Sequence, residues 1–199
     1  MLDILSKIFT LSGNGHLLPL IWLMAAGLIL SRMPMKHEYV CGQKKNNWYI
    51  SSAVLLVLPL IFWSAFRGYI GDTFAYKKHF SGIPATLSEL LPTLTADTKD
   101  PGFSVLMTLI KMLGVSDYRV FFLIIATVQM LCMVWTFRKY STNYWISIFL
   151  FVASTDYISW MFNGMRQFIA TTMIFGAFDL MVRRKHVAFT IVVLLAAQI

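Results

Sequence analysis

Long apolar runs, separated by short polar segments, are the feature of this sequence that most limits what it can fold into. A helix that crosses a bilayer needs about 20 mostly apolar residues, because the hydrocarbon core is about 30 Å thick. A shorter run at 101–114 contains Lys111, and a further run at 187–199 reaches the last residue. The runs that meet or approach spanning length lie at 16–31, 49–66, 119–137, 144–162 and 165–182.

The composition also favours a membrane protein. Hydrophobic residues make up 58% of the 199 residues and charged residues only 13%, whereas a soluble domain has about 25% charged residues. The apolar surplus is divided among separate runs and does not form one core. We therefore predict an all-α polytopic membrane protein, a single helical membrane domain over residues 1–199 with about six spans plus a truncated seventh segment.

The last apolar run is short. A helix over 187–199 covers only about 20 Å at about 1.5 Å per residue, which is less than the thickness of the hydrocarbon core. No polar cap or basic flank follows it. We expect the sequence to be an N-terminal fragment or a truncated product, and a natural stop within half a span is the alternative.

Basic residues are concentrated in three loops. Loop 32–47 has four basic residues and one acidic residue, loop 138–143 has two basic residues, and loop 183–186 has three. These loops account for the whole net charge of +8. The positive-inside rule therefore predicts that all three are cytoplasmic, and this distribution argues against nucleic acid as a partner.

This orientation places the N-terminus and residues 67–118 and 163–164 on the outer side. It also requires that the run at 101–114 does not cross the membrane alone. We expect a short re-entrant or interface-lying helix there, with Pro101 in its first turn and Gly114 at its end. The loop 67–100 has four basic and four acidic residues, a balance that suits the outer face.

An arginine and an aspartate follow the second predicted span. Gly68 and Gly71 lie between Arg67 and Asp72 and permit a tight backbone turn. Such a turn can bring a guanidinium and a carboxylate to one point at the membrane surface. Two structural alternatives remain: a cation is favoured at a helix C-terminus, and Asp72 can cap a short helix that follows it.

Arg166 lies at the predicted outer start of a span, after Asn163, which we expect to be its N-cap. A cation in the first helical turn opposes the helix dipole, and it also opposes the inside bias of basic residues. A helix N-terminus together with a guanidinium makes a phosphate-binding site. The alternative is an arginine that extends to the interface with its aliphatic stem buried.

Asp156 lies in the outer half of a predicted span, where an acid is costly and usually paired. Helical spacing places Asp156, Ser159 and Asn163 on one face. Asp156 is a candidate counter-ion of Arg166 or Arg67, or a ligand of substrate hydroxyls.

Other polar residues have simpler interpretations. Asp179 and Arg183 form an i, i+4 pair that we regard as structural, and Gln129 in mid-span predicts a hydrogen bond between helices. His79 in the outer segment is interpreted as a solvated residue, with ligand contact as the alternative. Because the sequence has only two cysteines and no zinc, nucleotide or hydrolase motif, we predict neither a metal site nor a cofactor.

At three places the sequence resembles the EpsG family, which comprises Wzy-like polymerases of bacterial exopolysaccharide and O-antigen repeat units. The most specific part of the resemblance is the third one, an Asn-Gly-x-Arg-Gln-x-x-Ala stretch. The second part has an aspartate where family members commonly have glutamate. The matching stretches are Arg67-(x)3-Gly71-Asp72-Thr73-(x)2-Tyr76, Asp100-Pro101-Gly102-Phe103 and Asn163-Gly164-(x)-Arg166-Gln167-Phe168-Ile169-Ala170.

The resemblance implies a glycosyltransferase of the bacterial inner membrane, acting at its outer face. Its substrates would be polyprenyl-diphosphate-linked oligosaccharides, and neither ATP nor a nucleotide sugar would be needed. Membrane lipid and other polysaccharide-assembly proteins are the further expected partners. Family members continue into additional spans and a histidine-containing segment, so whether these 199 residues are active by themselves stays open.

Combining this resemblance with the local chemistry gives a hypothesis for the site. Arg67 and Arg166 bind the diphosphate, because fixed cations stabilise the charge of a departing diphosphate. Asp72 acts as the base for the attacking hydroxyl or orients a sugar. The candidate substrate-binding residues are Tyr76, Asn163, Gln167 and Asp156.

Two other classes of protein remain as alternatives. A transporter or flippase of lipid-linked sugars also needs outer arginines, but it should carry charged residues along a path through the midplane. Here only Asp156 and Gln129 lie deeper. A non-catalytic partner in a polysaccharide-assembly complex would need no cluster of arginine and aspartate.

Overall fold

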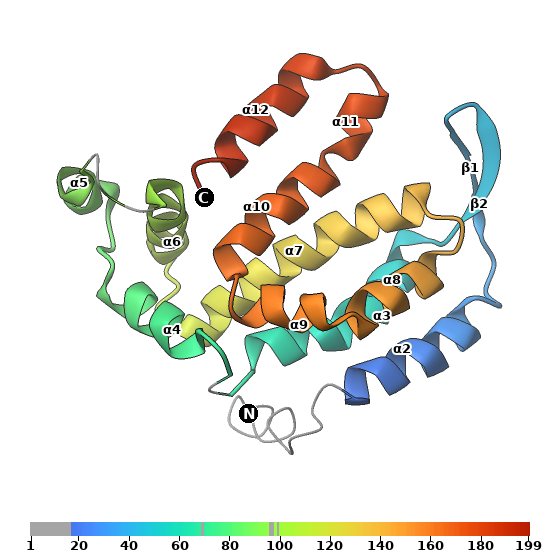
Figure 1. The fold of residues 1–199 in the computed structure, drawn as a ribbon, viewed down its shortest axis with the longest axis horizontal. Helices are drawn as coiled ribbons and strands as arrows, with labels where there is room; N and C mark the ends of the chain where they lie inside the picture. Colours follow the sequence, from blue (N-terminus) through green and yellow to red (C-terminus); the bar gives the residue numbers. More distant parts are fainter. Residues whose placement is uncertain (1–16, 69, 96–97, 99) are drawn as a thin grey trace.

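The computed structural model describes residues 17–68, 70–95, 98 and 100–199, apart from the side chains of residues 155, 156 and 158. It is mostly helical and contains one β-hairpin (Figure 1). In chain order the elements are α2 (Leu17–Leu30), β1 (Lys36–Val40), β2 (Gln43–Asn47), α3 (Ile50–Ala65), α4 (Thr73–Gly82), α5 (Leu87–Leu90), η1 (Leu91–Thr93), α6 (Pro101–Met112), α7 (Tyr118–Tyr140), α8 (Tyr144–Ala153), α9 (Thr155–Phe162), α10 (Met165–Gly176), α11 (Phe178–Val182) and α12 (His186–Ala196).

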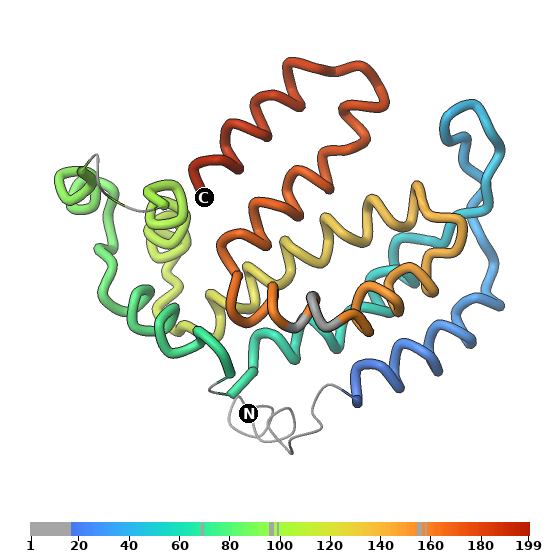
Figure 2. Tube along the Cα trace, viewed as in Figure 1, coloured from blue at the N-terminus to red at the C-terminus, as the bar shows by residue number. Residues whose placement is uncertain are grey.

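Helix α7 is the centre of the fold and packs along α3 and α10. Figure 2 shows the trace of α3 on one side of α7 and the trace of α10 on the other. One cluster of buried apolar side chains joins α2, α3 and α8 to α7. A second cluster joins α4 and α6 to the start of α7 and to α10. The second cluster fixes the outer segment of the sequence against the beginning of α10.

Of the helices in the described part of the chain, α7 alone is both long and apolar enough to cross a membrane. It has 23 residues and contains the predicted span 119–137. The shorter apolar helices α2, α3, α6, α8 and α12 have 10–17 residues. The prediction of a helical protein is therefore confirmed, whereas the predicted number of six spans is not.

Two predicted spans are interrupted. The run 144–162 divides into α8 and α9 at Ser154, whose hydroxyl donates to the carbonyl of Phe151 at 2.7 Å. Such a local hydrogen bond offers the backbone an alternative to the helix. The run 165–182 divides into α10 and α11 after Gly176, where a Cβ would lie 2.9 Å from Cys132. Apolar composition alone does not reveal these breaks.

The prediction of an all-α fold is wrong for loop 32–47, which contains an antiparallel hairpin. Its turn consists of Cys41 and Gly42, with φ of 51° and 78°. Two positive φ values are typical of the tight turns that match the twist of a hairpin. The hairpin escapes sequence analysis because a cysteine is an unusual residue in this conformation and because both strands are polar.

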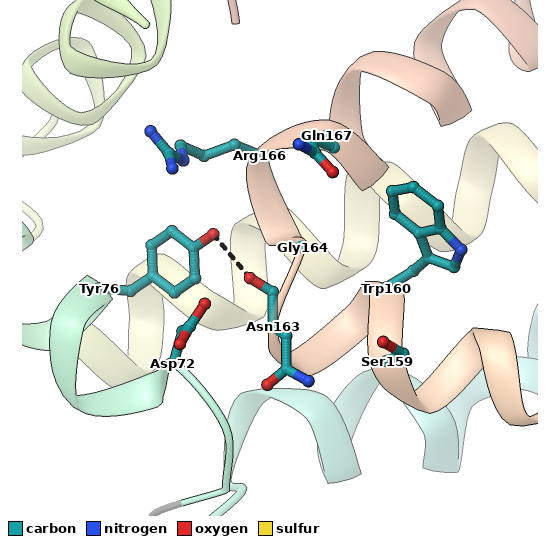
Figure 3. A pocket seen from close by; sticks show the side chains of 8 residues that line it. All are labelled: Asp72, Tyr76, Ser159, Trp160, Asn163, Gly164, Arg166 and Gln167. Atoms are coloured by element: carbon teal, nitrogen blue, oxygen red, sulfur yellow. Dashed lines mark hydrogen bonds between the residues drawn. The ribbon is translucent and has the colours of Figure 1, made fainter. Parts of the chain in front are cut away.

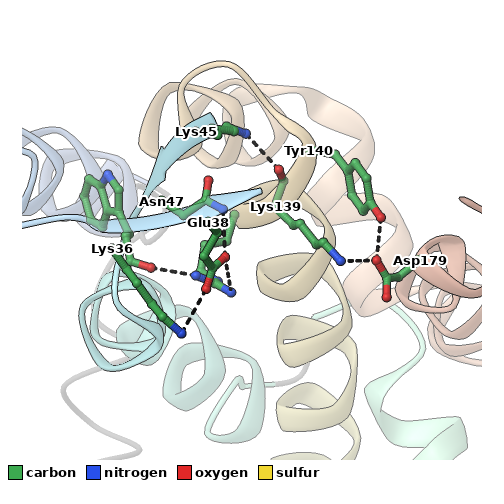
Figure 4. Close-up of polar contacts among 9 residues, drawn as sticks. Lys36, Glu38, Lys45, Asn47, Lys139, Tyr140 and Asp179 are labelled. Carbon is green, nitrogen blue, oxygen red and sulfur yellow. Dashed lines mark hydrogen bonds and ion pairs between the residues drawn. The ribbon is translucent and has the colours of Figure 1, made fainter. Parts of the chain in front are cut away.

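Polar contacts join the hairpin, the end of α7 and Asp179 of α11 (Figure 4), and Asp179 links this group to the third basic loop. Lys45 of the hairpin donates to the carbonyls of Lys139 and Ser141, at 2.8 and 2.5 Å. Asp179, close to the third loop, forms an ion pair with Lys139 and another with Arg183 at 2.6 Å. The predicted pairing of Asp179 with Arg183 is confirmed, and loops that were expected to share one side of the membrane share one end of the bundle.

The predicted helix at 101–114 is confirmed as α6. Pro101 occupies its first turn, the helix ends at Met112, and Gly114 follows with φ of 86°. This helix packs on α4, α7 and α10 through the side chains of the second apolar cluster.

Candidate functional site

A cavity of about 370 Å³ opens between the start of α4 and the turn that connects α9 to α10 (Figure 3). These two segments are about ninety residues apart in the chain. The structure brings together most of the residues that sequence analysis selected. The lining consists of Asp72, Tyr76, Ser159, Trp160, Asn163, Gly164, Arg166 and Gln167.

Asp72 is placed by a tight turn before α4. Gly71 has φ of 56°, and a Cβ at this position would collide with the side-chain amide oxygen of Asn163. Asp72 is in the N-cap position of α4, as the structural alternative predicted, but its side chain forms no capping hydrogen bond. Within the described part of the chain, its carboxylate has no hydrogen-bond partner and lines the cavity.

Asn163 ends α9, and Gly164 is the N-cap of α10. The prediction that Asn163 caps the following helix is therefore wrong by one residue. The Asn163 backbone instead accepts a hydrogen bond of 3.1 Å from the hydroxyl of Tyr76, which joins α4 to this turn. The side-chain amide of Asn163 approaches Gly71 so closely that a Cβ there would force this amide to move.

Arg166 lies in the first turn of α10, as predicted, and forms an ion pair with Asp100. Both side chains are 40% exposed, so the pair is open to solvent and to a ligand. The structure thus supplies Asp100 as the counter-ion of Arg166, where sequence analysis had suggested Asp156, whose side chain lies outside the described residues. Asp100 precedes Pro101 and has φ of 52°. The only sequence feature that pointed to Asp100 as a functional residue is its place in the Asp-Pro-Gly-Phe stretch.

Arg67 is not part of the cavity's lining and lies against the turn between α9 and α10. Its side chain is only 6% exposed, and it donates to the carbonyl of Met161 at 2.6 Å and to the sulfur of Met165 at 3.7 Å. The guanidinium also stacks on the rings of Phe122 and Phe162, 4.4 and 5.0 Å from their centroids. It therefore bridges the end of α9 and the start of α10, the turn that carries Asn163.

The charge of Arg67 is only weakly compensated. Burial lowers the pKa of its guanidinium to about 10, against the opposing influence of Tyr76, Asp72 and Tyr157. The side chain stays protonated at neutral pH. Its Nε atom has no hydrogen-bond partner among the described residues. A buried positive charge therefore lies near enough to Asp72 to interact with its carboxylate.

Gln129 supports the same turn from the other side. Its side chain is 1% exposed, and its amide nitrogen donates to the carbonyl of Met165 at 3.2 Å. The predicted interhelical hydrogen bond is therefore confirmed. Arg67 satisfies the carbonyl of Met161 in the last turn of α9, where a helix end leaves carbonyls free, and Gln129 adds a bond to the carbonyl of Met165 at the start of α10.

Trp160 was missed by sequence analysis as a lining residue. It lies in α9, is 41% exposed and packs close to the backbone of Gly164. A tryptophan near a predicted membrane interface is normally explained as an anchor, so the sequence offers no separate signal for it. An exposed aromatic face beside polar groups suits the apolar face of a sugar ring.

His79 lines a different cavity of about 720 Å³ between α4 and residues 83–98, together with Lys78 and mostly apolar neighbours. Burial and then the charge of Arg166 lower the pKa of His79. The imidazole is therefore neutral at pH 7 and does not add to the positive charge of Arg166.

The cavity combines an unpaired carboxylate, an accessible guanidinium, amide groups and an aromatic ring. A guanidinium near a helix N-terminus can bind a phosphate group. A carboxylate without a hydrogen-bond donor can accept a proton from a hydroxyl group.

In the comparison with known proteins, the family model described as the EpsG family matches residues 51–199. No curated protein sequence matches the chain. No solved structure matches it either. The matched range contains every residue that lines the cavity.

Proposed function

Because the chain belongs to the EpsG family, a family of membrane proteins of polysaccharide biosynthesis, we propose that it polymerises polyprenyl-diphosphate-linked oligosaccharide repeat units. The reaction is a glycosyl transfer at the outer face of the bacterial inner membrane. The products serve as exopolysaccharide or O-antigen chains.

One observation carries the proposal: Asp72 and Arg166, from segments far apart in the sequence, line one cavity. A glycosyl transfer from a lipid diphosphate needs a group that accepts the proton of the attacking hydroxyl. It also needs a cation that stabilises the diphosphate as it leaves. The cavity offers one group of each kind, with amides and an aromatic ring for the sugar.

In the proposed reaction, a hydroxyl oxygen of the acceptor repeat unit attacks the anomeric carbon of the donor chain. The bond between that carbon and the diphosphate oxygen breaks, and the electron pair departs with the polyprenyl diphosphate. Asp72 takes the proton of the attacking hydroxyl. Arg166 binds the diphosphate, which replaces Asp100 as its anionic partner. The reaction as proposed consumes no ATP and needs no further co-reactant.

The remaining residues position the substrate. Asn163 and Gln167 present amides to sugar hydroxyls, and Tyr76 holds the turn of Asn163 through its hydroxyl. We now assign Arg67 to a positioning role, because direct contact with a diphosphate would require its burial and its bond to Met161 to be given up. Its charge still favours an anion in the cavity.

The proposed orientation has the N-terminus outside and several membrane crossings. The cavity lies toward the first half of α7, where Phe122 contacts Arg67, while the basic loops lie at its last turn. A helix of 23 residues is about 35 Å long. From Phe122 to Lys139 the helix rises about 26 Å, so the cavity and the basic loops are separated by nearly the thickness of the hydrocarbon core, about 30 Å.

Complementation tests the assignment. In a strain that lacks the polymerase, we expect Arg166→Ala and Asp72→Asn each to reduce polymer formation at least about 100-fold, the usual contribution of a charged group in such a site. Polymer length is measured on gels of purified polysaccharide. Arg32→Ala and Glu89→Gln are the matched controls, because both residues are exposed and lie outside the cavity. Wild-type polymer in both site variants would refute the assignment.

An assay with purified components separates the enzyme from its alternatives. The full-length protein in liposomes receives lipid-linked repeat units without ATP. Longer polymer supports a polymerase, while movement of unchanged substrate across the bilayer supports a transporter. If neither occurs unless other assembly proteins are present, the chain is a partner subunit.

A further inference from the structure

A second, smaller cavity lies at the other end of the bundle, where the hairpin meets the loop between α7 and α8. Its volume is about 110 Å³. This is several times the share of one water, about 30 Å³, but well below the roughly 300 Å³ at which sites for larger ligands begin. The polar lining comprises Ser31, Lys45, Asn46, Asn47, Arg138, Ser141, Thr142 and Asn143.

Two cations line this cavity, and its lining contains no acidic residue. Lys45 donates to two carbonyls at the end of α7 but, among the described residues, has no carboxylate partner. Arg138 shares the single carboxylate of Glu38 with Lys36, each at 3.3 Å. Burial, and then the charge of Arg138, lower the pKa of Lys45. The two cations repel each other, and the one carboxylate beside them, that of Glu38, is shared with Lys36.

Two buried polar atoms at the cavity lack partners in the described part of the chain. The side chain of Arg138 is 8% exposed, and its Nε donor has no acceptor. Asn47 is 1% exposed, and its amide nitrogen donates to Glu38 at 2.8 Å, but its Oδ1 acceptor receives no hydrogen bond. Buried polar groups are nearly always satisfied, and a ligand with both an acceptor and a donor would satisfy this pair.

The start of α8 adds further donors. Tyr144 and Trp145 line the cavity and occupy the first turn of this ten-residue helix. The N–H groups of a first turn have no intrahelical acceptor, and the positive end of the helix dipole favours an anion there.

We propose that this cavity binds a phosphate monoester or inorganic hydrogen phosphate. Its oxygens accept hydrogen bonds from Lys45, from Arg138 and from the first turn of α8. The one protonated oxygen of hydrogen phosphate, or of a monoester bound as its monoanion, donates to Oδ1 of Asn47. This last contact distinguishes the ligand from sulfate, which carries no proton at neutral pH. The group belongs either to free phosphate or to the headgroup of a monophosphorylated lipid, and the position of the cavity at the basic end of the bundle admits both.

Calorimetry on the full chain in detergent tests the proposal with inorganic phosphate as the probe and sulfate at equal ionic strength as the reference. A second titration uses the protein in phosphatidylcholine nanodiscs with and without phosphatidic acid. Phosphate binding in detergent identifies the free anion as a ligand. Binding confined to nanodiscs that contain phosphatidic acid identifies the lipid headgroup. Either result supports the site if sulfate competes at least tenfold more weakly.

Lys44 provides the matched control for Lys45, because it is the neighbouring lysine of the same strand and is exposed. We expect Lys45→Gln to weaken binding at least tenfold, Lys45→Arg to retain it, and Lys44→Gln to leave it unchanged. If Lys45→Gln does not fold, Thr142→Val replaces it in the test. This variant removes one exposed hydroxyl from the lining, and we expect it to weaken binding. No heat with either probe, equal binding of sulfate, or equal effects of Lys44→Gln and Lys45→Gln would overturn the proposal.

Discussion

Among single residues, Arg67 and Arg166 lie in different environments although both are predicted diphosphate ligands. Arg166 is half exposed with a solvent-accessible partner, whereas Arg67 is buried against two backbone segments and two rings. A surface ion pair contributes at most about 1 kcal/mol. Loss of a buried charged donor exposes an unsatisfied carbonyl and costs about 1–3 kcal/mol.

The two arginines therefore predict different effects on stability. We expect Arg67→Met to lower the free energy of unfolding by about 1–3 kcal/mol and Arg166→Ala to change it by less than about 1 kcal/mol. Thermal unfolding of both variants in detergent measures the difference. Activity should fall in both variants. A second-site substitution that stabilises the fold should restore the activity of Arg67→Met but not that of Arg166→Ala. Equal melting temperatures for the two variants would contradict the positioning role of Arg67.

Gly71 is a second residue-scale determinant. We expect Gly71→Ala to destabilise the protein by more than about 1–2 kcal/mol, the cost of a left-handed conformation for an L-residue, because the new Cβ also displaces the amide of Asn163. Gly82→Ala at the end of α4 is the control, since its Cβ would meet nothing within 4 Å. Melting temperatures compare the two. An unchanged stability of Gly71→Ala would show that the turn can rearrange.

At the scale of elements, the hairpin β1–β2 holds the basic end of the bundle through Lys45 and the Arg138–Glu38 pair. Its turn contains a strained cysteine at φ 51°. Asparagine adopts this conformation more readily than other non-glycine residues. We expect Cys41→Asn to stabilise the protein by up to about 1 kcal/mol. Thermal unfolding is the measurement, with Cys41→Val as the control that should destabilise the turn.

The interrupted helices are the other element-scale finding. The breaks at Ser154 and after Gly176 shorten two apolar runs that otherwise read as continuous. The turn between α9 and α10 then lies beside α4, where Tyr76 and Arg67 hold it. The cavity exists because α9 is short and ends at Asn163.

At the scale of the whole molecule, the cavity and the basic loops occupy opposite ends of α7. If the proposed orientation holds, a thiol on the hairpin faces the cytoplasm and a thiol on α4 faces outward. Cys41 is exposed, and Lys78 is an exposed position in α4. An impermeant maleimide should therefore label Lys78→Cys, made in a Cys41→Ser background, in right-side-out vesicles.

Native Cys41 should react with the same reagent only in inverted vesicles. Cys132 is partly buried in α7 and should react slowly in both. Mass spectrometry of the labelled protein gives the result. Labelling of Cys41 and Lys78→Cys from the same side would exclude the predicted topology.

The sequence alone determined the helical class, the grouping of the three basic loops and most of the cavity's residues. The length of apolar runs and the distribution of basic residues are local properties of the sequence. They can be recognised without knowledge of the tertiary structure. The stretches around Asp72 and Arg166 also carried enough local chemistry and family resemblance to be selected.

Only the tertiary structure decided which of these residues meet. It placed Asp72 and Arg166 at one cavity, paired Arg166 with Asp100 and buried Arg67. It also created the hairpin and its small cationic cavity. The physical reason is that helical periodicity fixes which side chains share a face, whereas the packing of α4 and α6 on α7 and α10 fixes which faces come together.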